Sequence, residues 1–244
     1  MLNRLLLISI ISFALWSCEQ STTVTLQWQL TGNESTQLCD QATSTWQKID
    51  FFAYDFTLYD KQGNAFKLNQ LDHYGLSFIS VNCDRLEAIT ELQAPTMPAA
   101  IRSLEFTIGV PFALNHANPV TLEYPLNQPD TFWVWQTGHK FFQAEGRYQQ
   151  HNRVFHLGST GCLADSALRS PNQQCRQPNR HKLSIPINQS STTELQIAID
   201  PNALFKSLPQ AQALHCQSEP NNKLCSIIVN NLTQNSHSKL FRQL

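Results

Sequence analysis

The chain has 244 residues, of which 41% are hydrophobic and 14% are charged, with 17 basic and 18 acidic side chains. This share of apolar residues excludes an intrinsically disordered chain and suffices for the core of one β-rich domain or two small ones. A formal net charge of −1 without a basic run argues against binding nucleic acid through its phosphates, because that mode needs clustered Lys and Arg. The low charge, combined with many Thr, Ser, Asn and Gln residues, favours an exported β-protein.

The first residues of the chain have the features of a signal peptide. Arg4 supplies a positive charge, and residues 5–15 form an apolar stretch that is too short to span a bilayer as a resident helix. The stretch ends in the sequence LWSC, which resembles a bacterial lipobox, in which the cysteine is lipidated and becomes the new N-terminus. We therefore expect a lipoprotein signal peptide over residues 1–17 and a lipid anchor on Cys18. The alternative is an ordinary signal peptide followed by an incidental cysteine.

The residue after Cys18 indicates where the anchor would place the protein. Glu19 stands where an inner-membrane retention signal would have Asp, so the expected location is the periplasm or the cell surface, anchored to the outer membrane by lipid. No second apolar run approaches a membrane-spanning length. Residues 18–244 are therefore expected to form a single β-rich domain that reaches the membrane only through its lipid.

Apolar and polar residues alternate along many short segments, which is the period of a half-buried strand. In the first segment, Val24, Leu26, Trp28 and Leu30 alternate with Thr and Gln. Later segments of this kind cover residues 52–58, 104–110, 131–136, 140–145, 153–157, 183–187 and 195–199. Because turn-forming residues separate many short strands, we predict an all-β fold, either an antiparallel β-sandwich or a barrel.

Two short helices are expected near the C-terminus. Asp200 can cap one of them, with Pro201 at its first position. A second can run over residues 224–232. Neither has the length of a separate domain.

The cysteines indicate three disulfides. Removing Cys18 leaves six, an even number, in an oxidising compartment where disulfides persist. Six cysteines allow 15 connectivities, but two short spans favour local closure and leave the remaining two cysteines for each other. No C-x-x-C pair is present, which argues against a zinc or iron–sulfur site. The predicted disulfides are Cys39–Cys83, Cys162–Cys175 and Cys216–Cys225.

Sequence signatures of catalysis are absent. The chain contains no G-x-S-x-G elbow, no phosphate-binding G-x-x-x-x-G-K loop, no dinucleotide-binding G-x-G-x-x-G motif and no H-E-x-x-H. Ser159 closely follows His156, but a nucleophilic serine needs a base at its hydroxyl and a third group that orients the base. We therefore expect Ser159 to lie in a tight turn before Cys162, and the protein not to be an enzyme. A periplasmic hydrolase that uses His156 and Ser159 is the least favoured alternative.

Two histidines and two tryptophans lie in distinctive sequence settings. His116 belongs to a turn-rich loop after a strand, and His156 lies on the strand predicted over residues 153–157. Neutral imidazoles are natural ligands for copper or zinc where the thiols are consumed in disulfides, although a structural role is the alternative for each histidine. Trp133 and Trp135 lie two apart on one predicted strand and therefore on one face. This segment has three possible interpretations: a strand of the core, a platform on which sugars stack, or a redox-active site beside a metal.

Three blocks of the sequence resemble a known family. They are FTIGVPFALNH at residues 106–116, FWVWQTGHKF at residues 132–141 and FHLGSTGC at residues 155–162, and their order and spacing match as well. Shorter matches extend the likeness over nearly all of the mature chain: PNR at residues 178–180, the cysteine pair Cys216 and Cys225, and FR at residues 241–242. The chain thus resembles the MbnP-like family, also called metallo-mystery pair four-Cys proteins.

The resemblance implies a periplasmic or outer-membrane copper-binding protein that acts in copper homeostasis. Members of the family are usually made beside a MauG-like di-haem cytochrome c peroxidase, which oxidises a tryptophan of its partner to kynurenine. Carried over to this sequence, the implied copper ligands are His116 and His156, and the candidates for oxidation are Trp133 and Trp135.

Three positions depart from the family pattern. Tyr54 stands where many members have His, Asn118 stands where Asp is common before Pro119, and His139 stands where Tyr is common. Because one expected histidine is missing, His139 or Tyr54 is the candidate to complete the copper site. The alternative to copper binding is a surface lipoprotein that binds a glycan or a protein partner without a metal, with the two tryptophans as its aromatic platform.

Overall fold

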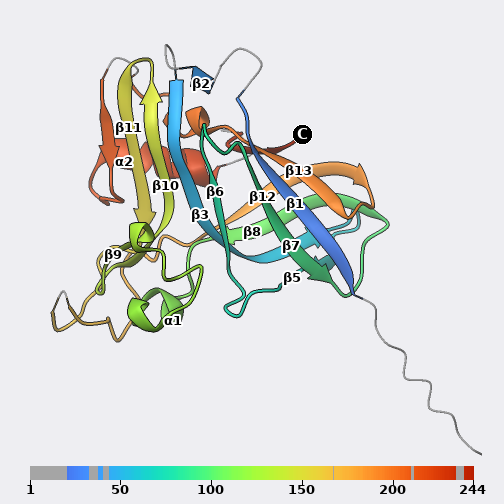
Figure 1. The fold of residues 1–244 in the computed structure, drawn as a ribbon, viewed down its shortest axis with the longest axis horizontal. Helices are drawn as coiled ribbons and strands as arrows, with labels where there is room; N and C mark the ends of the chain where they lie inside the picture. Colours follow the sequence, from blue (N-terminus) through green and yellow to red (C-terminus); the bar gives the residue numbers. More distant parts are fainter. Residues whose placement is uncertain (1–20, 33–37, 41–43, 167, 210–211, 235–238) are drawn as a thin grey trace, which may run out of the picture.

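The computed structural model describes residues 21–32, 38–40, 44–166, 168–209, 212–234 and 239–244. The predicted signal peptide and Cys18 lie outside the described residues. Two β-sheets form most of the described chain, and their strands run at a marked angle to one another (Figure 1). No helix within the described ranges is long and apolar enough to cross a membrane.

The first sheet has five strands. In spatial order they are β15 (Phe241–Gln243), β13 (Glu194–Ile199), β1 (Thr22–Leu30), β7 (Glu87–Ala94) and β5 (Asn69–Gln70). The central strand β1 pairs antiparallel with β7 and parallel with β13. The first sheet is therefore mixed.

The second sheet has ten strands and is built around the long strand β3 (Ser44–Tyr59). Its main path runs through β12 (His181–Ser190), β8 (Ala100–Ile108), β3, β10 (Gly138–Tyr148), β11 (His151–Gly158) and β14 (Leu214–Cys216). The shorter strands β2 (Cys39–Asp40), β4 (Ala65–Lys67) and β6 (Ser77–Val81) pair with β3, and β9 (Phe132–Val134) pairs with β10. The all-β, sandwich-like prediction is confirmed.

Two strand pairs differ from the antiparallel expectation. β1 and β13 are parallel, and so are β11 and β14. Parallel neighbours need a long connection, and both pairs join segments that lie far apart in the chain. Alternation within a strand reports which face is buried and carries no information about the direction of its neighbour, so the sequence pattern could not reveal these pairs.

The core forms where the apolar faces of the two sheets meet. Val24, Leu26 and Trp28 of β1 are fully buried, while the polar residues between them are partly exposed. The Trp28 ring makes edge-on contacts with Phe51 and Phe106 of the second sheet, with ring centroids 5.5 and 5.6 Å apart. Apolar burial is the main source of stability here, and edge-on ring pairs add to it.

The segment predicted as a strand over residues 131–136 behaves differently. Only Phe132–Val134 is extended there, and the Val134 side chain is 43% exposed. The Thr137 amide donates to the Val134 carbonyl at 3.1 Å, and Gly138 has a φ of 77°, so the chain reverses at this point. The interpretation of this segment as a core strand is therefore wrong, because it is one arm of a short hairpin.

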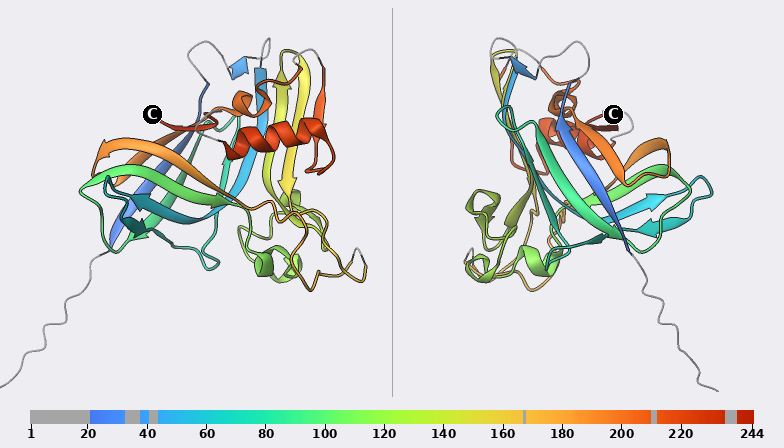
Figure 2. Two further views of the ribbon diagram at one scale, coloured as in Figure 1. Left: turned by 180° about the vertical axis from the view of Figure 1, so that it is seen from behind. Right: turned by 45° about the vertical axis from the view of Figure 1, so that its right-hand side comes forward.

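The two predicted helices are confirmed in position. Asp200 caps the first, a 3-10 helix (η3, Pro201–Phe205), by accepting from the Asn202 amide. The second is α2 (Lys223–Thr233), which lies across the second sheet (Figure 2). The sequence patterns missed three further short helices: α1 (Phe112–Asn115), η1 (Pro119–Thr121) and η2 (Pro129–Thr131).

All three predicted disulfides are present. Cys39 pairs with Cys83, Cys162 with Cys175, and Cys216 with Cys225. The two cysteine pairs that are close in sequence, at 162 and 175 and at 216 and 225, bond with each other, because closing a short loop costs less entropy. The sulfurs of these pairs are consumed in covalent bonds, so they cannot act as thiolate ligands.

Candidate metal centre

The predicted site residues gather at one end of the second sheet. There the chain leaves β8, crosses the end of the sheet through α1, η1, η2 and β9, and returns as β10. Figure 1 shows α1 and β9 together at this end, beside the ends of β10 and β11. We call residues 109–137 the cap segment. A loop over residues 159–166 and 168–180, closed by the Cys162–Cys175 disulfide, lies against it.

His116 lies at the end of α1 and is 6% exposed. Its Nε2 is 3.1 Å from the Asn115 side-chain nitrogen, which is a donor, so Nε2 accepts and the ring proton resides on Nδ1. Nδ1 then donates weakly to the Trp135 carbonyl at 3.4 Å. The Ser170 hydroxyl donates a hydrogen bond to the His116 carbonyl at 2.6 Å. Burial lowers the pKa of His116, which keeps the imidazole neutral.

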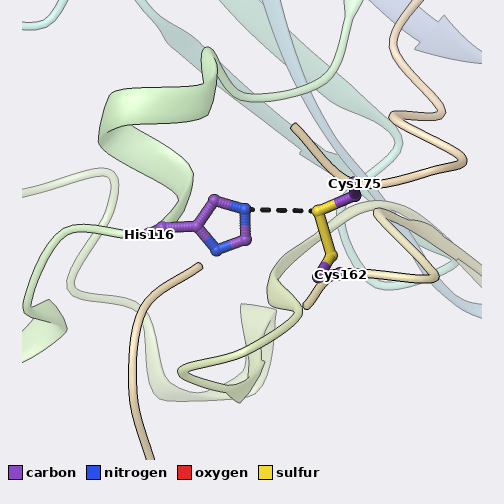
Figure 3. Close-up of side chains that lie close together, drawn as sticks. All are labelled: His116, Cys162 and Cys175. Atoms are coloured by element: carbon purple, nitrogen blue, oxygen red, sulfur yellow. Dashed lines mark hydrogen bonds between the residues drawn. A yellow bond between two sulfur atoms is a disulfide. The ribbon is translucent and has the colours of Figure 1, made fainter. Parts of the chain in front are cut away.

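The Cys162–Cys175 disulfide lies directly in front of His116. The Cys175 sulfur is 3.7 Å from His116 Nε2 (Figure 3). Side-chain atoms of all three residues lie within 4.8 Å of one another, a spacing that would suit a metal ion if the cysteines were reduced. Because the two sulfurs are bonded to each other, His116 alone offers a ligand atom in this group.

His139 is fully buried at the start of β10. Its Nε2 donates to the Leu126 carbonyl at 2.9 Å, which leaves the lone pair on Nδ1, and Nδ1 has no hydrogen-bond partner among the described residues. The ring lies edge-on to Phe52 and Phe132. Burial lowers the pKa of His139, so this imidazole is also neutral.

Asn115 joins His116 to His139. Its side-chain nitrogen donates to His116 Nε2, and its side-chain oxygen accepts from the His139 backbone amide at 2.8 Å. The amide also donates to the Thr137 carbonyl at 3.1 Å. A Cβ at position 138 would clash with Asn115, so only glycine allows this approach. Asn115 was not among the predicted site residues, although it belongs to the block at residues 106–116 that carries the family likeness.

His156 lies on β11 and is 7% exposed. Its Nε2 donates to the Glu145 carboxylate at 2.8 Å, and its Nδ1 is buried without a hydrogen-bond partner among the described residues. Burial lowers the pKa of His156 more than the Glu145 hydrogen bond raises it. A carboxylate that holds one ring nitrogen is the usual outer support of a metal-binding histidine. Sequence patterns do not pair Glu145 with His156, because the two meet only through the β10–β11 register, in which Glu145 lies diagonal to His156.

The two tryptophans of the cap segment contact different histidines. The Trp133 ring centroid is 6.3 Å from that of His156, and the ring packs on Gly158 so closely that a Cβ there would lie 2.5 Å from Cζ3. Trp135 follows β9 and offers its carbonyl to His116. The hairpin that carries both tryptophans thus connects the two histidines.

The remaining predicted site residues lie apart from these contacts. Tyr54 is half-buried on β3 opposite Thr107, and burial raises the pKa of its phenol. The Arg180 charge acts on both Tyr54 and His116, so both lie on the Arg180 side of the site. In the part of the chain that the structure describes, no group of three His, Cys, Asp or Glu ligand atoms within 4.8 Å includes His139 or His156.

Ser159 does not form a catalytic pair with His156. Its hydroxyl is buried and donates to the Pro178 carbonyl at 3.1 Å. His156 is bonded to Glu145 instead. The run before Cys162 is not the predicted tight turn, because Thr160 pairs with Gln177 in an isolated antiparallel bridge. Among the described residues, Ser159 lacks the Ser–His hydrogen bond that nucleophilic catalysis needs.

The donor set fits a metal that prefers nitrogen. His139 and His156 each have one ring nitrogen bonded to an oxygen and the other buried with an unused lone pair. Buried polar atoms without partners are rare and call for a water or an ion. The fold and this site define a two-sheet β-protein with neutral histidines buried beneath an irregular cap.

Comparison with known proteins identifies the family. The model of the MbnP family matches residues 19–224, so the chain belongs to the MbnP family. The solved structure of MbnP from Methylosinus trichosporium is similar, with a TM-score of 0.67 and 16% sequence identity, and the match covers 86% of this chain and 87% of that chain. At this identity the match shows a shared fold. No curated protein sequence matches the chain.

Proposed function

We propose that the protein binds copper in the periplasm or at the outer membrane and serves copper homeostasis without being an enzyme. The observation that carries this proposal is the Glu145–His156 pair, in which a carboxylate holds one ring nitrogen and the other is a buried, unpartnered lone pair. Imidazole suits copper, which stands at the top of the divalent affinity series. Membership of the MbnP family supports copper as the metal.

The ligands we propose are nitrogens of His156 and His116, with His139 as the candidate third. His156 and His139 would bind through Nδ1, and His116 through Nε2, which would have to release its hydrogen bond from Asn115. The three nitrogens do not lie within 4.8 Å of one another in this structure, so one ion held by all three requires the cap segment to move toward it. Copper held there would supply a redox-active ion next to an indole. Neutral imidazoles need not lose a proton before they bind a metal, and burial keeps all three neutral.

Copper content tests the ligand assignment. His156→Ala and His116→Ala should each lower the copper stoichiometry of protein purified from its own host, because each removes one of few ligands. His151→Ala is the matched control, since it lies on the same strand β11 and is not a proposed ligand. Full copper content in the His116 and His156 double variant would end the assignment.

We also propose that a MauG-like di-haem cytochrome c peroxidase oxidises Trp133 to kynurenine. The support is position, because the Trp133 ring lies against Gly158 and 6.3 Å from His156, whereas Trp135 meets His116 only through its carbonyl. The modification cleaves the C2–C3 bond of the indole and releases C2 as formate, with hydrogen peroxide, the oxidant of a peroxidase, reduced to water; the peptide loses one carbon and gains one oxygen. Peptide mass spectra of residues 131–140 should show this change at Trp133 when the two proteins are made together, and an unmodified peptide when this chain is made alone. Modification at Trp135 instead would contradict the choice.

A lipid on Cys18 is the proposed membrane anchor. The apolar stretch before the cysteine is removed with the signal peptide, so acyl chains on Cys18 supply the membrane affinity of the mature protein. The wild-type protein should partition with outer membranes, and Cys18→Ala should release or mislocalise it. A wild-type protein that is recovered in the soluble fraction with an unmodified N-terminus would refute the anchor.

A further inference from the structure

A cavity lies on the cap side of the second sheet, near the proposed copper ligands but without them: in the strand register, Gln143 stands between Asp50 at the cavity floor and His156. It has a volume of about 440 Å³ and is bounded by β3, β6, the turn before β7, and the cap segment. Its lining includes Asp50, Ser80, Arg85 and Tyr124 and none of the three histidines proposed as ligands. Figure 1 shows β6 and β7 side by side at this place.

The floor of the cavity holds a buried carboxylate. Asp50 is 9% exposed and lies opposite Ser80 in the β3–β6 register, where the Ser80 hydroxyl donates to it. No ion pair to Asp50 is present among the described residues, and burial raises its pKa. A buried carboxylate without a contacting cation is costly, and a cationic ligand would remove that cost.

Gln143 adds a second unmet polar group beside Asp50. It lies directly opposite Asp50 in the β3–β10 register, so the two side chains are neighbours on one face of the sheet. Gln143 is 1% exposed, and neither its amide nitrogen nor its oxygen has a partner among the described residues. Gln143 does not line the cavity and also lies opposite His156, so its unpartnered amide separates the cavity floor from the proposed copper site and Asp50 alone supplies the polar group of the floor.

The rim supplies a positive charge and an apolar wall. Arg85 is exposed, and its Nη2 donates to the Ser80 hydroxyl at 2.5 Å, which uses one of its five donors. The rings of Phe78 and Tyr124 meet at 83° with centroids 6.5 Å apart, and the Ile89 side chain next to them is 66% exposed. The cavity thus offers an anion at its floor, a cation at its rim that the Ser80 hydroxyl bridges to this anion, and an apolar wall beside them.

We propose that this cavity binds an apolar α-amino acid as a zwitterion. Its ammonium group would meet Asp50, its carboxylate would meet the Arg85 guanidinium, and its side chain would pack on Phe78, Ile89 and Tyr124. A guanidinium matches a carboxylate in geometry, and an ammonium gains from both a carboxylate and nearby ring faces. The acidic groups Glu87 and Asp130 also line the cavity, so the site favours the ammonium end of the ligand over a simple anion.

Three related probes test the two charges separately by calorimetry. L-Leucine carries both charges, leucinamide lacks the carboxylate, and N-acetyl-leucine lacks the ammonium. The wild-type protein should bind L-leucine, bind leucinamide more weakly, and not bind N-acetyl-leucine. Undetectable binding of L-leucine at millimolar concentrations, or equal binding of N-acetyl-leucine, would overturn the proposal.

Matched variants assign each charge to its residue. Asp50→Asn should weaken L-leucine and leucinamide at least tenfold, whereas Arg85→Gln should weaken L-leucine and leave leucinamide unchanged. Asp165→Asn, an exposed acid that does not line the cavity, should bind like the wild type. Wild-type affinity in Asp50→Asn would overturn the assignment of the ammonium.

Two further measurements guard against a misfolded variant and separate this proposal from copper binding. Tyr124→Ala changes a side chain that is 61% exposed and should weaken L-leucine without altering the thermal unfolding midpoint. Unchanged leucine affinity in Tyr124→Ala would contradict the placement of the ligand. Copper content should be normal in Asp50→Asn, because Asp50 is not a proposed ligand, so a failure of leucine binding and a failure of copper binding are distinguishable.

Discussion

The two-sheet frame and the cap segment bury different kinds of side chain. In the frame, buried aromatic rings meet edge-on between the sheets, as Trp28 does with Phe51. In and under the cap, the buried side chains include Asn115, His116 and His139, which are held by hydrogen bonds to one another and to backbone carbonyls. Apolar burial supplies most of the stability of a fold, whereas buried polar networks fix geometry. Substitutions in the frame should therefore change stability, and substitutions around the cap should change metal binding.

The largest expected effect is on the frame. Trp28→Ala should lower the free energy of unfolding by about 3–5 kcal/mol, because it leaves a cavity among buried rings. Trp135→Ala, in the half-buried turn of the cap, should cost clearly less. Urea denaturation of both variants measures the difference. Equal losses would mean that the cap contributes to the core as much as the frame does.

The longest disulfide loop should matter next. Replacing Cys39 and Cys83 by Ala should cost about 2–5 kcal/mol, because their bond closes a span of 44 residues in the unfolded chain. Replacing Cys216 and Cys225, which are 9 residues apart, is the matched control and should cost about 1 kcal/mol less. Denaturation of the two double variants decides the order. A larger loss in the control would show that local packing outweighs loop closure.

A smaller effect is expected at the outer support of the metal site. Glu145→Gln should lower copper affinity by about 10–100-fold, because it weakens the hydrogen bond that orients His156. Its folding stability should change little, since the Glu145 side chain is 32% exposed. Glu105→Gln on β8, which loses an ion pair to Lys182, is the control and should bind copper normally. Unchanged affinity in Glu145→Gln would remove His156 from the ligand set.

The pH dependence of stability should be the mildest effect, and it involves the frame as well. Burial lowers the pKa of His181 on β12 below the value of 6.5 that it has in the unfolded chain. The unfolded chain therefore takes up a proton first, so this contribution to stability is complete above pH 6.5 and is lost as the pH falls through the folded-state pKa. His181→Gln should make the decline in acid shallower. If stability falls in acid as steeply in His181→Gln as in the wild type, the fall in stability comes from the histidines of the cap region and not from His181.

The frame could be predicted from sequence because its signal is local. Alternation at residues 24–30 requires only that one face be buried, and β1 buries that face. The same logic failed at residues 131–136, where Trp133 and Trp135 alternate as a strand would. A turn at Thr137 and Gly138 ends the strand early, and the alternation does not report such a turn.

The candidate metal site could be predicted only in part, because the contacts of its residues are not local. The family likeness pointed to His116 and His156, and His139 entered as a candidate because it departs from the family pattern; the supports of these histidines were not identified. Glu145 reaches His156 through the register of two strands, and Asn115 reaches His139 through a fold of the cap segment over the sheet. The register of the strands and the position of the cap segment depend on the whole fold. Local patterns in one sequence therefore do not predict them.

The position of the cap segment in the chain also bears on the family likeness. The strands on either side of it, β8 and β10, both pair with β3, so the main path of the second sheet runs from β8 to β10 without residues 109–137, which add only the short strand β9 and the hydrogen bond from Gly109 to Phe52. The cap segment connects β8 and β10, two neighbours of β3, in the way that a recognition loop connects two strands of an antibody domain. Two of the three sequence blocks that carry the family likeness, residues 106–116 and 132–141, lie largely in this segment although the main path of the sheet does not need it, so the likeness reports the chemistry of the cap more than the scaffold that carries it.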